Sequence, residues 1–150
     1  MRETTLCYIE KDESYLMLHR TKKKPDGSYE KWLGVGGKLE KGESSEECVL
    51  REVREETGYT LTDYKYRAKI FFYSDTWEDE IMYLYTATGF EGEEIPCDEG
   101  ELVWVPKSEV TNLKIWEGDK LFLNRLVESD EFFELELRYE GDNLASYKWL

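Results

Sequence analysis

Four glutamates lie close together around one expected helix of this chain. Glu43 comes just before the helix, and Glu52, Glu55 and Glu56 follow one another at i, i+3 and i+4 spacing, which places them on one side of it. Carboxylates on adjacent turns repel one another, and a face that served only solubility would interleave lysines. Such a cluster is typical of a site for a hard divalent cation such as Mg²⁺, although the spacing alone also allows a solvated acidic face.

The helix that must position these carboxylates is expected over residues 44–57. Ser44 and Glu47 fit the S-x-x-E pattern of a capping box at its start. Gly58 follows where helices commonly stop. Arg51 falls in another sector of the helical wheel than the glutamates. The local sequence therefore defines both ends of the helix.

Most of the remaining chain is predicted to form strands. The segments are rich in β-branched and aromatic residues or alternate apolar with polar residues, as half-buried strands do. They span residues 4–9, 15–20, 64–73, 80–90, 101–106, 132–139 and 144–150, with a glycine-rich apolar segment at 32–39 and a second helix at 117–127. The sequence predicts one domain over residues 1–150, of α/β (α+β) class, with a mixed β-sheet between helices.

The composition excludes several classes of partner. Asp and Glu number 34 against 20 Lys and Arg, a net charge of −14, so binding to duplex DNA is not expected. No signal peptide and no apolar run of about 18 residues is visible, so no membrane partner is expected. Cys7, Cys48 and Cys97 lack disulfide or zinc spacing. We expect a cytoplasmic protein with reduced thiols, and no obligate protein partner is evident.

Residues 37–59 follow the pattern G-x5-E-x7-R-E-U-x-E-E-x-G-U, where U is apolar. This pattern closely resembles the signature of the Nudix hydrolases, with one departure, Tyr59, at a usually aliphatic position. The resemblance implies an α/β/α sandwich with a mixed sheet between helices. It also implies hydrolysis of a nucleoside diphosphate linked to another group, with Mg²⁺ (or Mn²⁺) as the cofactor.

The resemblance implies roles for individual residues. The metal ligands would be Glu52, Glu55, Glu56 and the backbone carbonyl of Gly36. Arg51 would orient the glutamates by ion pairing, and Glu43 would support the metal site. A carboxylate would take a proton from a metal-bound water, and Glu52 is the first choice and Glu56 the second. Family members often use a glutamate from a later loop instead. The candidates there are Asp98, Glu99 and Glu101, of which Glu99 is favoured, although a plain acidic loop is an open alternative.

Two further segments resemble the branch of the family that hydrolyses oxidised-purine nucleoside triphosphates. They are W-L-G-V-G-G-K at residues 32–38 and I-W-E-G-D at residues 115–119. The resemblance implies that Trp116 stacks on the purine and that Asp119 hydrogen-bonds it. Cleavage would release a nucleoside monophosphate and pyrophosphate. The residues expected to contact phosphate oxygens are Arg20, Lys22, Lys23 and Lys38.

Leu33 and Gly118 replace polar residues of that branch, which leaves alternatives open. The first is a Nudix hydrolase of another substrate: a nucleotide-sugar, a dinucleoside polyphosphate or a capped RNA. The second is a non-catalytic nucleotide-sensing module. Such modules usually lack some of the signature glutamates, and all of these are present here.

Overall fold

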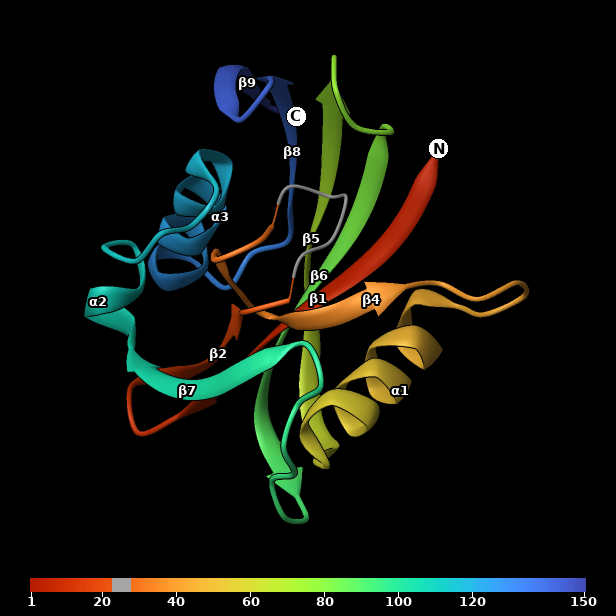
Figure 1. Ribbon diagram of the computed structural model, residues 1–150, viewed down its shortest axis with the longest axis vertical. Coiled ribbons are helices and arrows are strands. Elements are labelled where there is room, and N and C mark those ends of the chain that lie inside the picture. Colours follow the sequence, from red (N-terminus) through yellow and green to blue (C-terminus); the bar gives the residue numbers. More distant parts are fainter. Residues whose placement is uncertain (23–27) are drawn as a thin grey trace.

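A mixed β-sheet lies between two helices in the computed structural model, which describes residues 1–22 and 28–150 (Figure 1). The elements follow in the order β1 (Arg2–Lys11), β2 (Ser14–Arg20), β3 (Trp32–Leu33), β4 (Val35–Lys38), α1 (Ser45–Thr57), β5 (Thr60–Ser74), β6 (Glu80–Glu91), β7 (Gly100–Pro106), α2 (Lys107–Val110), α3 (Glu117–Glu128), β8 (Phe133–Glu140) and β9 (Asn143–Trp149). The predicted class, a mixed sheet between helices, is confirmed.

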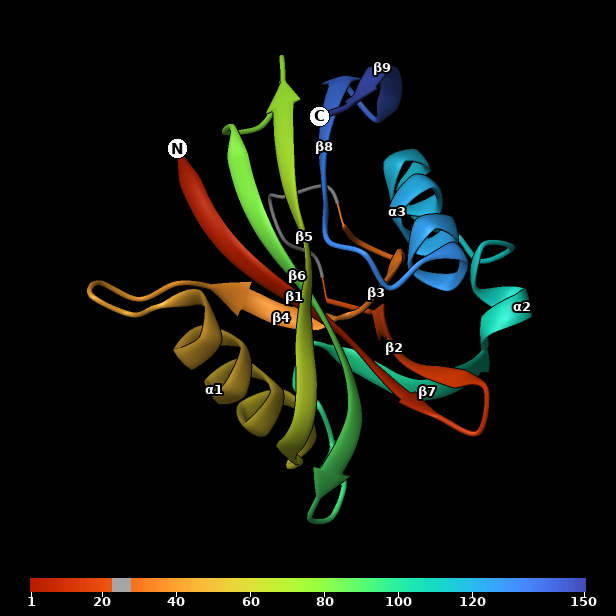
Figure 2. The same cartoon turned by 180° about the vertical axis from the view of Figure 1, so that it is seen from behind.

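Strand β1 is at the centre of the sheet. The strand order is β3-β2-β1-β6-β5-β8-β9, with β4 also paired to β1 and β7 to β2. The pairs β1–β6 and β5–β8 are parallel, and the others are antiparallel. In the β1–β4 pair, Leu6 lies opposite Gly36 and Thr5 opposite Gly37. The glycine-rich segment is therefore held directly against the central strand, which Figure 2 shows from behind.

The two faces of the sheet bury separate apolar clusters. Alternate residues of β1 point to opposite faces, as strand geometry requires. Tyr8 lies in the cluster under α3, where its ring centroid is 6.4 Å from that of Phe122. The next residue, Ile9, lies in the cluster under α1 with Val49 and Val53. Both helices are thus fixed on opposite faces of the same strand.

The structure differs from the sequence prediction in three elements. Strand β5 begins at Thr60 and not at residue 64, because its pairing with β6 extends to the Thr60–Glu91 pair, soon after α1 ends. The segment 32–39 forms two strands, since β3 pairs with β2 whereas β4 pairs with β1. The short helix α2 was not predicted; it is a four-residue element with no apolar repeat of its own.

Neither disulfides nor membrane-spanning helices are present among the described residues. Cys7, Cys48 and Cys97 are all free thiols, and the first two are buried. None of the helices in the described part of the chain is long and apolar enough to cross a bilayer.

Helix α1 has the predicted signals at both ends. The Ser44 hydroxyl accepts a hydrogen bond from the Glu47 amide (3.1 Å), and the Glu47 carboxylate accepts one from the Ser44 amide (3.0 Å), which completes the capping box. Gly58 ends the helix with φ of 84°, a left-handed conformation, and donates its N–H to the Arg54 carbonyl. These caps fix the segment that carries the signature glutamates.

Replacing Gly58 by alanine should lower the free energy of unfolding more than replacing Gly42. Both glycines have positive φ, 84° and 78°, so a side chain costs about 1 kcal/mol at each. At Gly58 the new Cβ would also lie 2.4 Å from the Glu93 carbonyl oxygen, whereas at Gly42 nothing lies within 4 Å. We expect about 1–3 kcal/mol of additional loss for Gly58→Ala in urea unfolding. Equal losses for the two variants would contradict this account of the helix end.

Candidate active site

Arg51 connects the carboxylates that surround helix α1. Its guanidinium binds Glu43 with two hydrogen bonds, from Nε (2.7 Å) and Nη2 (2.9 Å). Nη1 donates to Glu52 (2.7 Å) and to Glu55 (3.3 Å), and Nη2 also donates to the Lys38 carbonyl (3.2 Å). Although Arg51 falls in another sector of the helical wheel, its long side chain reaches Glu43, Glu52 and Glu55. One cation thus holds three carboxylates in a fixed arrangement.

Glu43 is the most strongly held of these carboxylates. The hydrogen bonds from Arg51, with a further one from the Glu40 amide (3.0 Å), lower the pKa of Glu43 to about 2. It is therefore ionised at neutral pH, and both of its oxygens accept hydrogen bonds. This arrangement suits a carboxylate that supports the site better than one that accepts a proton.

Glu56 and Glu52 lie on the inner side of the cluster, where the loop residue Glu99 also approaches. Burial raises the pKa of Glu56, and the like charges of Glu99 and Glu52 raise it further. The pKa of Glu52 is also raised, mainly by burial. The Gly36 amide donates a hydrogen bond to Glu56 (3.1 Å). Three carboxylates thus share a half-buried space in which their negative charges repel one another.

Two glycines of β4 let the backbone run against this cluster. A Cβ on Gly37 would lie 2.5 Å from the carboxyl carbon of Glu52, and one on Gly36 would lie 1.9 Å from the Thr5 carbonyl oxygen. Only glycine fits at these positions without moving the backbone or the carboxylate. The carboxylates therefore stand directly beside backbone groups of Gly36 and Gly37.

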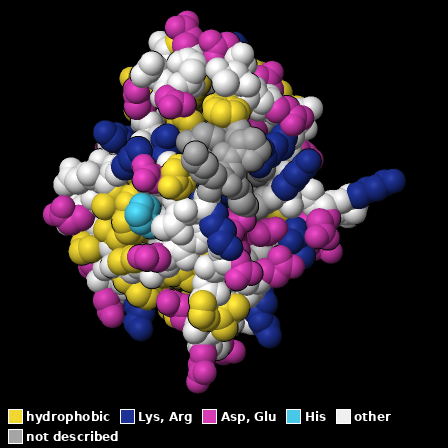
Figure 3. All heavy atoms as spheres, viewed as in Figure 1, with side chains coloured by type: hydrophobic (Ala, Val, Ile, Leu, Met, Phe, Trp, Pro, Cys, Tyr) yellow, Lys and Arg dark blue, Asp and Glu magenta, His cyan; other side chains and the backbone are white. Residues whose placement is uncertain are grey.

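The chemistry of this donor set fits a divalent cation. Among the described residues, no three acidic, histidine or cysteine side chains already stand in the arrangement of a metal site, and Arg51 binds two of the predicted ligands. However, oxygen ligands of like charge held together in a half-buried place are what Mg²⁺ binds. Glu52 and Glu56 are brought together by the structure, whereas the side chain of Glu55 is 59% exposed at the rim. Figure 3 shows acidic side chains gathered over the region of α1.

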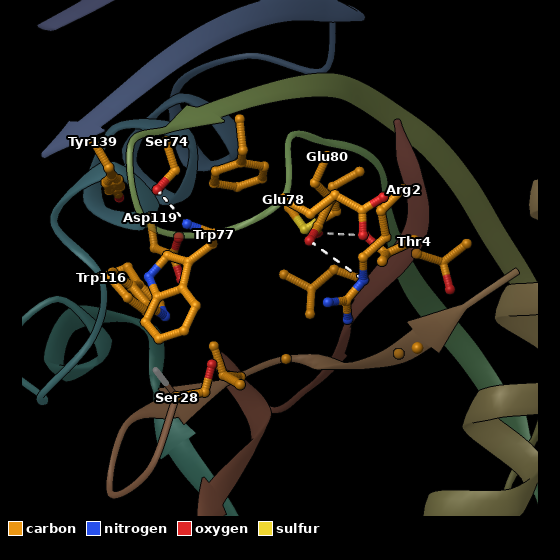
Figure 4. A pocket seen from close by; sticks show the side chains of 18 of the residues that line it. Arg2, Thr4, Ser28, Ser74, Trp77, Glu78, Glu80, Trp116, Asp119 and Tyr139 are labelled. Atoms are coloured by element: carbon orange, nitrogen blue, oxygen red, sulfur yellow. Dashed lines mark hydrogen bonds and ion pairs between the residues drawn. The ribbon is translucent and has the colours of Figure 1, made fainter. Parts of the chain in front are cut away.

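A cavity of about 340 Å³ extends from Gly36 and Gly37 between the sheet and the start of α3. Trp116 and Asp119 line it on the α3 side, and Trp77 and Glu80 line it from the turn between β5 and β6 and the start of β6 (Figure 4). The cavity begins at the same glycines that adjoin the carboxylates. A ligand could therefore extend from the acidic cluster into the cavity.

Asp119 is a buried carboxyl group on the wall of the cavity. Its exposed fraction is 4%. Burial raises the pKa of Asp119 to about 8, with a smaller contribution from Glu80, while Lys31 acts in the opposite direction. A carboxyl group in this position can hydrogen-bond a ligand that enters the cavity.

Trp116 lies just before α3, and two side chains contact its ring. Its ring centroid is 5.4 Å from that of Tyr139 at an angle of 64°, and the Lys31 amine lies 4.2 Å from the ring centroid. The Tyr139 hydroxyl also accepts a hydrogen bond from the Gly118 amide (2.8 Å). A Cβ on Gly118 would lie 2.7 Å from Tyr139 and Leu137 side-chain atoms, so this position offers no side chain to a ligand.

The predicted phosphate-binding residues have different positions. Arg20 is buried, lines the cavity and donates to Glu99 (3.3 Å), so it joins the cavity to the acidic cluster. Lys38 is exposed, and its carbonyl binds Arg51. Lys22 is exposed and is not part of the cavity lining. It lies beyond the end of β2 at Arg20. Lys23 lies outside the described residues.

Comparison with known proteins decides the family. The family model described as NUDIX domain matches residues 1–126. The chain belongs to the Nudix family. The Nudix hydrolases generally use divalent metal ions and act on small-molecule nucleotide substrates. The expected α/β/α sandwich of this family is the fold observed.

Three relatives illustrate the similarity of this Nudix chain to known members. A MutT protein from Bacillus halodurans has a crystal structure with a TM-score of 0.87, at 28% identity over 99% of this chain and 97% of its own. An uncharacterized Nudix hydrolase, YvcI of Bacillus subtilis, is 26% identical over 99% of this chain and 94% of its own. The oxidized purine nucleoside triphosphate hydrolase of Danio rerio is 29% identical over 68% of this chain and 66% of its own.

The sequence prediction did not identify several residues of this Nudix cavity. Trp77 lines it from an acidic turn, Tyr139 from β8, and Lys31 fixes Trp116 from behind the lining. Of these residues, only Trp77 could have been noticed in the sequence. It is a large aromatic residue in an otherwise acidic turn, where no apolar core is expected. Tyr139 was predicted only as part of an alternating strand, which does not indicate what the side chain meets.

Replacing Asp119 by asparagine should stabilise the protein, and the gain should grow with pH. The pKa of about 8 in the folded state lies above the usual value near 4, so the folded protein binds more protons than the unfolded chain between these pH values. The free energy of unfolding of the wild type therefore falls as pH rises through this window, by at most about 1.4 kcal/mol per pH unit.

Denaturant unfolding between pH 5 and pH 9 measures this effect. The advantage of Asp119→Asn should increase up to about pH 8 and then level off. Glu117→Gln, an exposed change in the same helical turn, should show no such rise. A constant difference between wild type and Asp119→Asn would contradict the assignment of a buried, protonated Asp119.

Proposed function

We propose that this Nudix hydrolase uses Mg²⁺ to hydrolyse a nucleoside triphosphate, with an oxidised purine as the preferred base, to a nucleoside monophosphate and pyrophosphate. The observation that carries the proposal is the buried carboxyl group of Asp119, which lines a cavity that starts at the glycines of the acidic cluster. A substrate with phosphates at one end and a hydrogen-bonding ring at the other matches this arrangement.

The phosphate end of the substrate would lie beside the acidic cluster. Glu52, Glu55, Glu56 and the carbonyl of Gly36 would hold the metal. The bound metal would neutralise phosphate oxygens and lower the pKa of a coordinated water. Arg51 forms ion pairs with Glu52 and Glu55, and Arg20, which lines the cavity, would contact a phosphate from the cavity side.

One of three carboxylates would take the proton of the attacking water. Glu52 and Glu56 are the candidates from the helix, and Glu99 is the candidate from the loop. Like charge and burial surround both helix candidates, which favours proton uptake by this group of carboxylates. Glu99 is bound to Arg20, so a phosphate that engages Arg20 would also affect Glu99.

The base would occupy the far part of the cavity. Trp116 offers an aromatic surface for stacking, and Asp119 offers a buried hydrogen-bonding group. A site that binds a polar group of one base with a buried partner rejects bases that lack that group. The similarity to the Danio rerio enzyme supports an oxidised purine as this base.

A second candidate is supported by Leu33 and Gly118. Leu33 lines the cavity with an apolar side chain, and Gly118 has no room for one, so neither can hydrogen-bond a base edge. Reduced base recognition favours substrates whose discrimination lies elsewhere: a nucleotide-sugar, a dinucleoside polyphosphate or a capped RNA. A non-catalytic sensing module is disfavoured by the complete set of signature glutamates.

A substrate panel with matched variants tests these proposals. Pyrophosphate or phosphate release is measured from 8-oxo-dGTP, dGTP, dATP, a nucleotide-sugar, a dinucleoside polyphosphate and a capped RNA. Glu56→Gln should lower kcat by about 10²- to 10⁴-fold, since it removes a metal ligand and a candidate base. Glu46→Gln, an exposed change on the same helix, should leave kcat unaltered.

The ratios within the panel decide the substrate. We expect kcat/KM for 8-oxo-dGTP to exceed that for dGTP by at least about tenfold, or about 1.4 kcal/mol. A smaller ratio would reject the oxidised purine, and a higher value for one of the other substrates would establish the second candidate. Activity that survives both Glu55→Gln and Glu56→Gln would reject metal-dependent Nudix hydrolysis.

A further inference from the structure

Lys31 is a nearly buried lysine beside the base end of the cavity. Its exposed fraction is 9%, although lysines are seldom buried without a reason. Its amine lies 4.2 Å from the centroid of the Trp116 ring, close enough for a cation–π interaction. Tryptophan is the best aromatic partner for such a cation. This contact gives Lys31 a specific position behind a residue proposed to stack on the base.

The backbone holds Lys31 and Trp116 in fixed relation. The Lys31 amide donates to the Ser28 carbonyl (3.0 Å), and its carbonyl accepts from the Arg20 amide (3.0 Å). The adjacent Trp32 amide donates to the carbonyl of Lys114 (2.8 Å), two residues before Trp116. The segment of Lys31 and the segment of Trp116 are therefore joined by the main chain as well as by the side chains.

Lys31 supports the Trp116 ring from outside the cavity. Trp116 is part of the cavity lining, whereas Lys31 is not. The amine therefore contacts the ring without occupying the space of a ligand. Tyr139 meets the same ring at a steep angle. With Lys31 and Tyr139 in place, Trp116 cannot easily turn away from the cavity.

The charge of Lys31 also acts on Asp119. Four groups on separate elements influence this carboxyl or are influenced by it: Lys31 before β3, Glu80 on β6, Tyr8 on β1 and Tyr139 on β8. Burial and Glu80 raise the pKa of Asp119 to about 8, and Lys31 is the group that lowers it. Removal of the lysine charge would therefore raise the pKa of Asp119.

We propose that Lys31 is a positioning residue of the base pocket, which backs the Trp116 ring and adjusts the charge of the Asp119 carboxyl, a role that rests on the proposed function of this cavity. Lys31 touches neither phosphate nor the reacting atoms. It acts through the two residues that would contact the base.

The test compares Lys31→Met, which keeps length and removes charge, with Lys31→Arg, which keeps the charge. In the ligand-free protein, an NMR titration of the Asp119 carboxyl carbon gives its midpoint directly. Lys31→Met should move this midpoint to higher pH by roughly 0.5–1 unit, because a positive neighbour is lost. Lys31→Arg should leave it close to that of the wild type.

Kinetics with the preferred nucleoside triphosphate supply the second readout. Lys31→Met should raise KM by about three- to thirty-fold with kcat little changed, since the change acts on the two residues that would contact the base and not on the acidic cluster. The pH at which KM changes should move upward together with the Asp119 midpoint. Lys31→Arg should retain the wild-type KM. Melting temperatures of both variants establish that they are folded.

The outcomes separate this inference from the proposed function. An unchanged Asp119 midpoint in folded Lys31→Met, or equal KM values for Lys31→Met and Lys31→Arg, would overturn the role of Lys31 even if the enzyme hydrolyses nucleotides as proposed. If the wild type hydrolyses no nucleoside triphosphate, the proposed function fails. In that case the ligand-free titration still decides whether Lys31 governs Asp119.

Discussion

The repulsion among half-buried carboxylates is the constraint on which the rest of this structure depends. Glu52 and Glu56 lie against the glycine backbone of β4, where the charge of Glu99 acts on both, and burial disfavours the charged form of both helix residues. A protein selected only for stability would avoid such a group of charges, because each buried charge without a partner is costly. Arg51 offsets part of this cost by binding Glu52 and Glu55, and a metal ion would offset the remainder.

The sheet brings this charged group and the cavity to the two ends of the proposed substrate path. Helix α1 packs on one face of β1 and supplies the carboxylates, while α3 packs on the other face and supplies Trp116 and Asp119. Strand β4 runs along β1 between them, and its glycines adjoin both the carboxylates and the cavity. The acidic net charge of −14 is thus compatible with phosphate binding only where a cation can intervene.

Interactions between residues close in the sequence could be predicted, whereas contacts between distant segments could not. The ends of α1 were predicted because Ser44, Glu47 and Gly58 act within a few residues of the helix. The ion pairs of Arg51 with Glu52 and Glu55 were expected only from the family resemblance, and its pair with Glu43 was not predicted, since a helical wheel ignores the reach of a long side chain. The contact of Lys31 with Trp116 joins segments far apart in the chain, and no local pattern indicates it.

Thermal unfolding with increasing Mg²⁺ tests the central claim most directly. If the carboxylate cluster is stabilised by a cation, the melting temperature of the wild type should rise with Mg²⁺ concentration, as expected for a ligand that binds only the folded state. Glu56→Gln should melt at the same or a higher temperature than the wild type without metal, because one repelling carboxylate is gone, and should lose most of the response to Mg²⁺. A wild type that is indifferent to Mg²⁺, or a Glu56→Gln variant that responds equally, would contradict the account.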